Sequence, residues 1–324
     1  MGGHQQGHQP LRRLQAASLH PAQQPPGLPA NRIRALHVGP DGRLWAGAES
    51  AGLSLYDADH NRFQPINARY AGPAHRRLAR LLSQASVVAL AAGPGGQLWV
   101  GTERNGLFAL RFDGQRRLVA LRRVPQPGPQ PGLAYHAAAL ALDADGRLWV
   151  GTMGAGLRCL DTRIPAGAGD LAAALAGAPN VRALHLDRRG DLWVGTDRQV
   201  LWVASAQRRA PGPLVAKALP TPYADIQSVL LDSFGRLWVG TTYGLHLWEA
   251  AAATGTELPL RLDHYSQFLP VDNDPNSINS ERVHQVFEDR NQVLWLAASA
   301  GGLNKVDLRQ KPFHNLQRQG ALAG

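Results

Sequence analysis

Short polar segments follow a Gly-Thr pair at several places in this chain of 324 residues, and they carry the side chains best suited to recognising a ligand. The residues around these segments are nearly constant, whereas the segments themselves change. Variable polar tips on a constant frame favour a binding site in loops, although each residue could equally be a solvated loop residue without a role. The candidate ligand-binding residues are Glu103, Arg104, Asn105, Asp197, Arg198, Thr242 and Tyr243, joined by Tyr135 and His136 just before a later apolar run.

Catalytic and metal-binding chemistry finds less support in the sequence. No Ser/His/Asp arrangement, pair of carboxylates or phosphate-binding loop stands out. His37 and His185 occupy equivalent places, but two histidines are too few for a usual metal site. The Asp143–Gly146 segment resembles a calcium loop, yet it lacks the remaining ligands and favours a hairpin turn. We therefore predict no catalytic residue, no metal and no cofactor.

The elements that must position these loops come from a repeat. A similar phrase occurs six times: a short apolar run, an Asp or Gly turn, Leu-Trp-Val-Gly-Thr or a close variant, and then usually Gly-Leu. Repeats of roughly 40 to 50 residues that are rich in strand-forming residues predict a β-propeller with one four-stranded blade per repeat. Large aromatic side chains at one repeated position are expected to pack between blades. They are Trp45, Trp99, Trp149, Trp193, Trp238 and Trp295.

This reading predicts an all-β chain of about six blades, which could be an incomplete part of a seven-bladed ring. The propeller is expected over residues 28–318, after a loosely attached segment 1–27 and before a tail at 319–324. An outer strand could come from residues 11–19 or from 312–316, and short helices are expected at 76–82 and 171–176. The blades are assigned to residues 31–68, 85–122, 135–164, 179–218, 224–268 and 281–318.

Charge and composition place few limits on partners. The formal net charge is +10, with 34 basic and 24 acidic residues. Scattered arginines favour solvated edges over a dedicated surface for acidic glycans, nucleic acid or lipid, and no nucleic-acid motif is apparent. The single cysteine, Cys159, is expected to be a small buried residue. As written, the chain has no signal-peptide core and no membrane span, so we expect a soluble chain that is not exported.

The stretch from Asp143 to Leu157 resembles the two-component regulator propeller repeat, and so do Asp274–Ile278 and Gly301–Asn304. The resemblance covers about residues 28–318. It implies a sensory domain of a bacterial signalling protein that faces the periplasm, binds a glycan or other small extracellular ligand, and precedes a kinase or cyclase module. The six repeats and the lack of an output module and export signal depart from that pattern. We expect a non-catalytic sensor; the alternatives are a protein-interaction scaffold and a propeller enzyme resembling streptogramin lyase.

Overall fold

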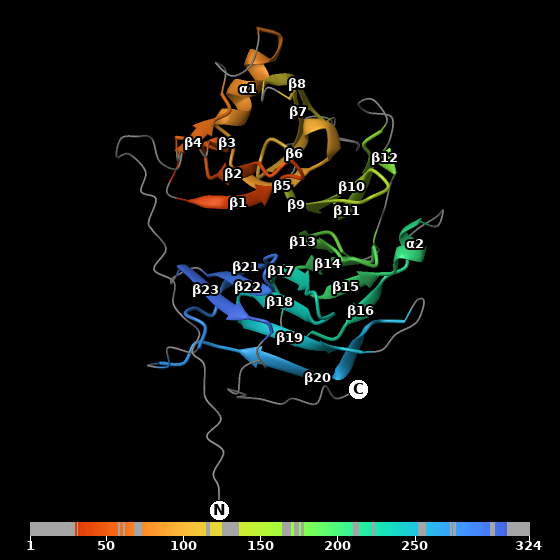
Figure 1. Cartoon of the computed structure of the whole chain (residues 1–324). Helices are drawn as coiled ribbons and strands as arrows, with labels where there is room; N and C mark the ends of the chain where they lie inside the picture. Colours follow the sequence, from red (N-terminus) through yellow and green to blue (C-terminus); the bar gives the residue numbers. More distant parts are fainter. Residues whose placement is uncertain are drawn as a thin grey trace, which may run out of the picture. The chain divides into compact units, whose positions relative to one another are not determined.

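The computed structural model describes residues 30, 32–57, 59–60, 62–67, 73–114, 117–124, 136–163, 170–171, 175, 178–209, 214–221, 224–251, 257–272, 274, 277–298 and 302–309. These residues form antiparallel sheets that follow one another along the chain as the blades of a β-propeller (Figure 1). The predicted all-β fold with about six blades is confirmed. The possible strands at 11–19 and 312–316, the tail at 319–324 and Tyr135 lie outside the described residues.

The first three blades each contain four strands in sequence order from one edge of the sheet to the other. Blade 1 consists of β1 (Ile33–Val38), β2 (Leu44–Ala48), β3 (Gly52–Asp57) and β4 (Arg62–Pro65). Blade 2 consists of β5 (Val87–Ala92), β6 (Gln97–Thr102), β7 (Leu107–Phe112) and β8 (Leu118–Arg123). Blade 3 consists of β9 (His136–Leu142), β10 (Arg147–Met153), β11 (Leu157–Asp161) and β12 (Asp170–Leu171).

The last three blades repeat this pattern. Blade 4 consists of β13 (Val181–Leu186), β14 (Leu192–Thr196), β15 (Val200–Val203) and β16 (Lys217–Leu219). Blade 5 consists of β17 (Ile226–Leu231), β18 (Leu237–Thr241), β19 (Gly244–Ala250) and β20 (Leu260–Phe268). Among the described residues, blade 6 has three strands: β21 (Val283–Glu288), β22 (Val293–Ala298) and β23 (Gly302–Asp307).

Two compact units divide the chain, and each is described by itself. The N-terminal unit comprises Ser18–Gly190 and Gln207–Val215, and so contains blades 1 to 3 and β13. The C-terminal unit includes Asp191–Ala206 and Ala216–Gly324, and so contains β14 to β16 and blades 5 and 6. In the N-terminal unit, the first strands β1, β5, β9 and β13 contact one another in that order.

The helices are short. α1 (Arg76–Ser83) confirms the helix predicted at 76–82; it packs against β3 and β8 and buries Ala79 and Leu82. The helix predicted at 171–176 is wrong at its start, because Asp170 and Leu171 form β12, which pairs with β11. Strand pairing satisfies the backbone there in place of a helix cap. The other helical segments are η1 (Pro73–His75), η2 (Pro94–Gly96) and α2 (Ser205–Arg209).

Three of the repeated tryptophans, Trp45, Trp99 and Trp238, pack against the next blade. The Trp45 ring lies 4.9 Å from the ring of Phe112 in blade 2, and Trp99 belongs to a core cluster with Leu148 and Val150 of blade 3. Trp238 packs in the same way with blade 6. Five of the six are buried and Trp295 is half-buried. Burying an aromatic side chain of this size removes roughly 150–250 Å² from water, so these residues make a large contribution to blade packing.

The closeness of the next blade explains the glycine after the Trp-Val pair at Gly101, Gly151 and Gly240. A Cβ at Gly101 would lie 2.5 Å from the backbone oxygen of Ala137, and a Cβ at Gly151 would lie 2.6 Å from a methyl of Val181. Real Cβ atoms do not approach other atoms so closely, so a larger residue would push the blades apart. The constant glycine therefore sets the distance between the second strand of one blade and the first strand of the next.

Candidate functional site

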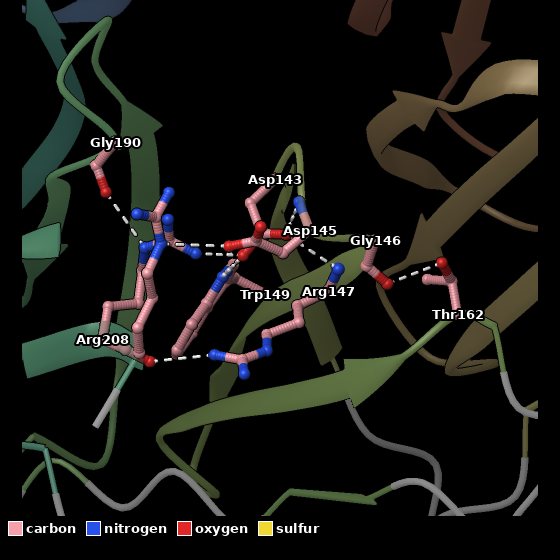
Figure 2. A network of polar contacts seen from close by, with 9 residues as sticks. Asp143, Asp145, Gly146, Arg147, Trp149, Thr162, Gly190 and Arg208 are labelled. Atoms are coloured by element: carbon pink, nitrogen blue, oxygen red, sulfur yellow. Dashed lines mark hydrogen bonds and ion pairs between the residues drawn. The ribbon is translucent and has the colours of Figure 1, made fainter. Parts of the chain in front are cut away.

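The most connected polar group in the N-terminal unit is buried around Asp143, in the turn between β9 and β10 (Figure 2). Its carboxylate accepts hydrogen bonds from Trp149 Nε1 (3.1 Å), from two backbone N–H groups of its own turn (2.9 Å each) and from the Arg208 guanidinium. Arg208, in α2, also donates to the Gly190 carbonyl (3.0 Å) and lies 5.8 Å from the Trp149 ring centre. The Asp143 and Arg208 side chains are each only 2% exposed. This group therefore fixes the structure and is closed to a ligand.

The same bond from an indole to an aspartate recurs in the C-terminal unit. Trp238 Nε1 donates to Asp232 (2.8 Å), and Trp295 Nε1 donates to Asp289 (3.0 Å). Burial acts to raise the pKa of Asp289, but hydrogen bonds from Trp295 and from backbone N–H groups outweigh it, so the pKa is lowered. Sequence reasoning assigned these aspartates only to the turn. The constant spacing of six residues between the Asp and the Trp was the signal that could have revealed their second partner.

The loops between the second and third strands, which we call the 2–3 loops, are fixed by the threonine of the Gly-Thr pair. Thr102 Oγ1 accepts a hydrogen bond from the Asn105 N–H (3.0 Å) and donates one to the Gly106 carbonyl (2.6 Å). Equivalent pairs of bonds are made by Thr152, Thr196 and Thr241. A side chain that bonds the backbone of its own turn holds that turn in one shape. The constant threonine thus holds the variable loop tips in place.

Two of the predicted site residues in the N-terminal unit, Glu103 and His136, interact electrostatically. Glu103 is half-buried in the 2–3 loop of blade 2, and its N–H donates to the Ser86 carbonyl (2.9 Å). His136 is half-buried at the start of β9. Burial lowers the His136 pKa, the charge of Glu103 acts to raise it, and Arg34 and Arg182 act to lower it. The other residues of that loop are Arg104, which is exposed, and Asn105, which is half-buried.

The remaining predicted residues lie on two 2–3 loops of the C-terminal unit. The Asp197 carbonyl accepts a hydrogen bond from the Asp225 N–H (3.0 Å), which joins the loop of blade 4 to the entry of blade 5. Arg198 is exposed at the same loop. Tyr243 is 54% exposed, and its carbonyl accepts a bond from Gln267 Nε2 (3.0 Å). Thr242, beside it, is half-buried. A ligand-binding role for all these residues stays a prediction.

The structure adds a position that sequence reasoning missed. The first strand of five blades contains an irregularity at the residue eleven places before the Trp, where one residue has no partner in the register. β-Bulges of this kind redirect a side chain and are frequent beside functional sites. The residue changes type between repeats, whereas those on either side of it are mostly small or apolar. The bulged residues are Arg34, Val88, Ala138, Gln227 and His284, and Arg182 holds the same repeat position in β13.

His37, one of the two histidines considered for metal binding, has another explanation. His37 Nε2 accepts a hydrogen bond from the Ala92 N–H (3.0 Å) in blade 2, and burial lowers its pKa. Within the described ranges, no group of three or more His, Cys, Asp and Glu side chains could hold a metal ion. The helices described there are all too short or too polar to cross a bilayer. Cys159 is buried in β11, as predicted, and burial raises its pKa to about 12.

With this geometry in place, comparisons with known proteins identify the repeat. A family model described as the two component regulator propeller matches residues 27–50, 131–154, 175–198 and 222–243. Four segments of the chain are therefore similar to the two component regulator propeller repeat. This confirms the resemblance inferred from the Asp143–Leu157 stretch. No curated protein matches the chain.

Solved structures share the fold of this repeat protein. The extracellular domain of a putative hybrid two component system from B. thetaiotaomicron has a TM-score of 0.58 at 17% identity, covering 90% of this chain and 35% of that one. The extracellular domain of a putative one component system from the same organism has a TM-score of 0.53 at 18% identity, covering 85% and 38%. Virginiamycin B lyase from Staphylococcus aureus has a TM-score of 0.59 at 14% identity, covering 86% and 82%. The chain spans little more than a third of the length of those extracellular domains.

Proposed function

We propose that this chain is a non-catalytic sensory propeller that binds a ligand through its 2–3 loops. The observation that carries the proposal is the combination of variable polar loop tips with a constant threonine that fixes each loop. Loops that are already ordered lose little conformational entropy on binding, so their polar groups can contribute more of their interaction energy to affinity. A propeller that bound no ligand would not need ordered 2–3 loops whose polar residues differ from blade to blade.

The signalling context rests on the repeat family and on the neighbouring structures, which are extracellular domains of two component and one component systems. By that analogy, the ligand is a glycan or other small extracytoplasmic molecule. Binding would act on a kinase or cyclase module of a longer parent protein. A scaffold for protein partners is the alternative. Because virginiamycin B lyase shares the fold, the experiment must also test whether this chain converts its ligand into a product.

The test is a glycan array probed with the whole chain. We expect saturable binding to at least one glycan and no product by mass spectrometry after prolonged incubation. Thr102→Val removes the hydroxyl that fixes the blade 2 loop and should weaken binding. The matched control is Thr162→Val, because Thr162 Oγ1 also donates to a backbone carbonyl (Gly146, 2.7 Å) but lies outside the 2–3 loops. Product formation, or equal binding by the two variants, would contradict the proposal.

A further inference from the structure

Two segments of the N-terminal unit contain arginines but no acidic residue. No Asp or Glu occurs between Asp59 and Glu103, or between Asp113 and Asp143. The first of these stretches contains η1 and α1, and the second contains β8, the edge strand of blade 2. Both η1 and α1 contact β8 (Figure 1). The fold therefore brings together two acid-free segments that are distant in the sequence.

The exposed residues of α1 are all arginines: Arg76, Arg77 and Arg80. Arg76 and Arg80 lie one helical turn apart with Arg77 beside them, on the side of the helix opposite its buried residues. Arg123, at the end of β8, is also exposed. It extends from the same face of its strand as Leu121, which belongs to one core cluster with the buried side of α1. We call these four arginines the arginine patch.

The stability of the fold does not explain the arginine patch. Within the described ranges, none of its guanidiniums forms an ion pair or a hydrogen bond. The first turn of α1 contains Arg76 and Arg77 but no acidic residue. Cations are unfavourable at the positive end of a helix dipole, and so are like charges four residues apart, such as Arg76 and Arg80. Because these choices cost stability, an anionic partner explains the arginines better than helix formation does.

We propose that the arginine patch binds the phosphate headgroups of an anionic lipid surface. Arginine holds a phosphate through two parallel N–H···O bonds, and clusters of about four or more basic residues on an amphipathic helix are typical of proteins that bind anionic membranes. Val119 of β8 is 44% exposed, and an apolar side chain beside arginine stems suits the boundary between headgroups and acyl chains. The phosphate backbone of a nucleic acid offers no such apolar contact. The patch would thus hold the N-terminal unit against a membrane, a role beyond ligand binding by the 2–3 loops.

The test is co-sedimentation of the full chain with vesicles of phosphatidylcholine, alone or mixed with phosphatidylglycerol, at low and high salt. We expect binding to be at least about ten-fold tighter to the anionic vesicles and to weaken as salt rises. Combining Arg76→Gln, Arg77→Gln and Arg80→Gln should weaken that binding at least about ten-fold. The triple variant should not lower the melting temperature, because glutamine favours a helix about as well as arginine does. The matched control removes the same charge from exposed arginines elsewhere and should bind like the original chain; it combines Arg188→Gln, Arg282→Gln and Arg290→Gln.

Each other outcome overturns the lipid assignment. Equal losses in the two triple variants would show that total charge, and not the arginine patch, governs binding. Equal binding to neutral and anionic vesicles would exclude headgroup phosphates as the partner. If vesicles do not bind but a single- or double-stranded oligonucleotide does, and the α1 variant loses that binding, the patch recognises a nucleic acid instead. The α1 variant should keep any glycan binding by the 2–3 loops, so this inference and the proposed function can fail separately.

Discussion

Replacing Arg208 by methionine tests whether the buried group around Asp143 holds the N-terminal unit together. The two side chains are each 2% exposed, so the substitution leaves a buried carboxylate without its cation. Breaking a buried ion pair by removing one partner costs roughly 3–5 kcal/mol. Methionine can still pack against the Trp149 ring, so the expected loss comes from the unpaired charge more than from lost packing.

A matched control lies next to Arg208 in the same helix. Arg209 pairs with Asp145 at 3.1 Å, but those side chains are 57% and 42% exposed. An exposed ion pair contributes at most about 1 kcal/mol, so Arg209→Met should change stability little. Adding Asp143→Asn to Arg208→Met should recover part of the loss, because asparagine removes the unpaired charge and keeps one oxygen for the two N–H groups of its own turn.

The assay is urea unfolding of the full chain, followed by circular dichroism and by tryptophan fluorescence. Two probes are needed because the two compact units could unfold in separate steps. The midpoint should fall clearly for Arg208→Met and stay within error for Arg209→Met. Equal midpoints for the two variants would refute the reasoning, and so would a further loss when Asp143→Asn is added to Arg208→Met.

Three further predictions concern stability. Trp149→Phe should cost about 1 kcal/mol more than Trp99→Phe in urea unfolding, because the Trp149 indole N–H has an acceptor and that of Trp99 has none; equal costs would contradict this. Gly96→Ala should lower the melting temperature far more than Gly42→Ala: both have positive φ (72° and 74°), but only at Gly96 would the Cβ meet a backbone oxygen, at 2.2 Å. Burial lowers the pKa of His246 to about 4, so the unfolded chain takes up a proton first as pH falls below 6.5. Unfolding free energy should therefore drop by about 2 kcal/mol from pH 7 to pH 5, and a His246→Gln variant with the same slope would rule out this origin.

Much of the fold could be predicted because the same turn and core residues recur across the repeats, so each blade gives independent evidence for the positions of its strands. The tryptophan, the turn glycine and the Gly-Leu pair indicated where the strands begin. The repeat that lacks the turn glycine still has a positive φ at that position. Gln292 stands where other repeats have glycine, and it adopts a positive φ of 60°. The helix at 76–82 was also predictable from its residues, whereas strand β12 was not. Its two residues owe their conformation to pairing with β11, a contact that local sequence does not encode.

The site was harder to predict, because its geometry depends on which blades meet. The 2–3 loops could be located from their changing residues, but nothing in the sequence indicated that the charges of Glu103, Arg34 and Arg182 act on His136. The β-bulge that marks the position of Arg34 is a break in strand register, and it has no residue signature of its own. The hydrogen bond from Trp149 to Asp143 was hidden for a related reason, since the turn already explained the aspartate.

Each repeat has constant positions that contact the next blade and variable positions in its 2–3 loop and β-bulge. This difference explains why the candidate site lies in the loops. Residues that touch the next blade, such as Gly101 and Gly151, cannot change without moving a neighbour by about an ångström or more, so they are the same in every repeat that needs the close approach. Side chains at the loop tips are freer to change, because Arg104, Arg198 and Tyr243 are exposed and the loops are held through backbone groups. Six copies of one frame therefore offer many independent choices of polar group. A ligand with several distinct groups, such as an oligosaccharide, is the kind of molecule that such an arrangement can distinguish.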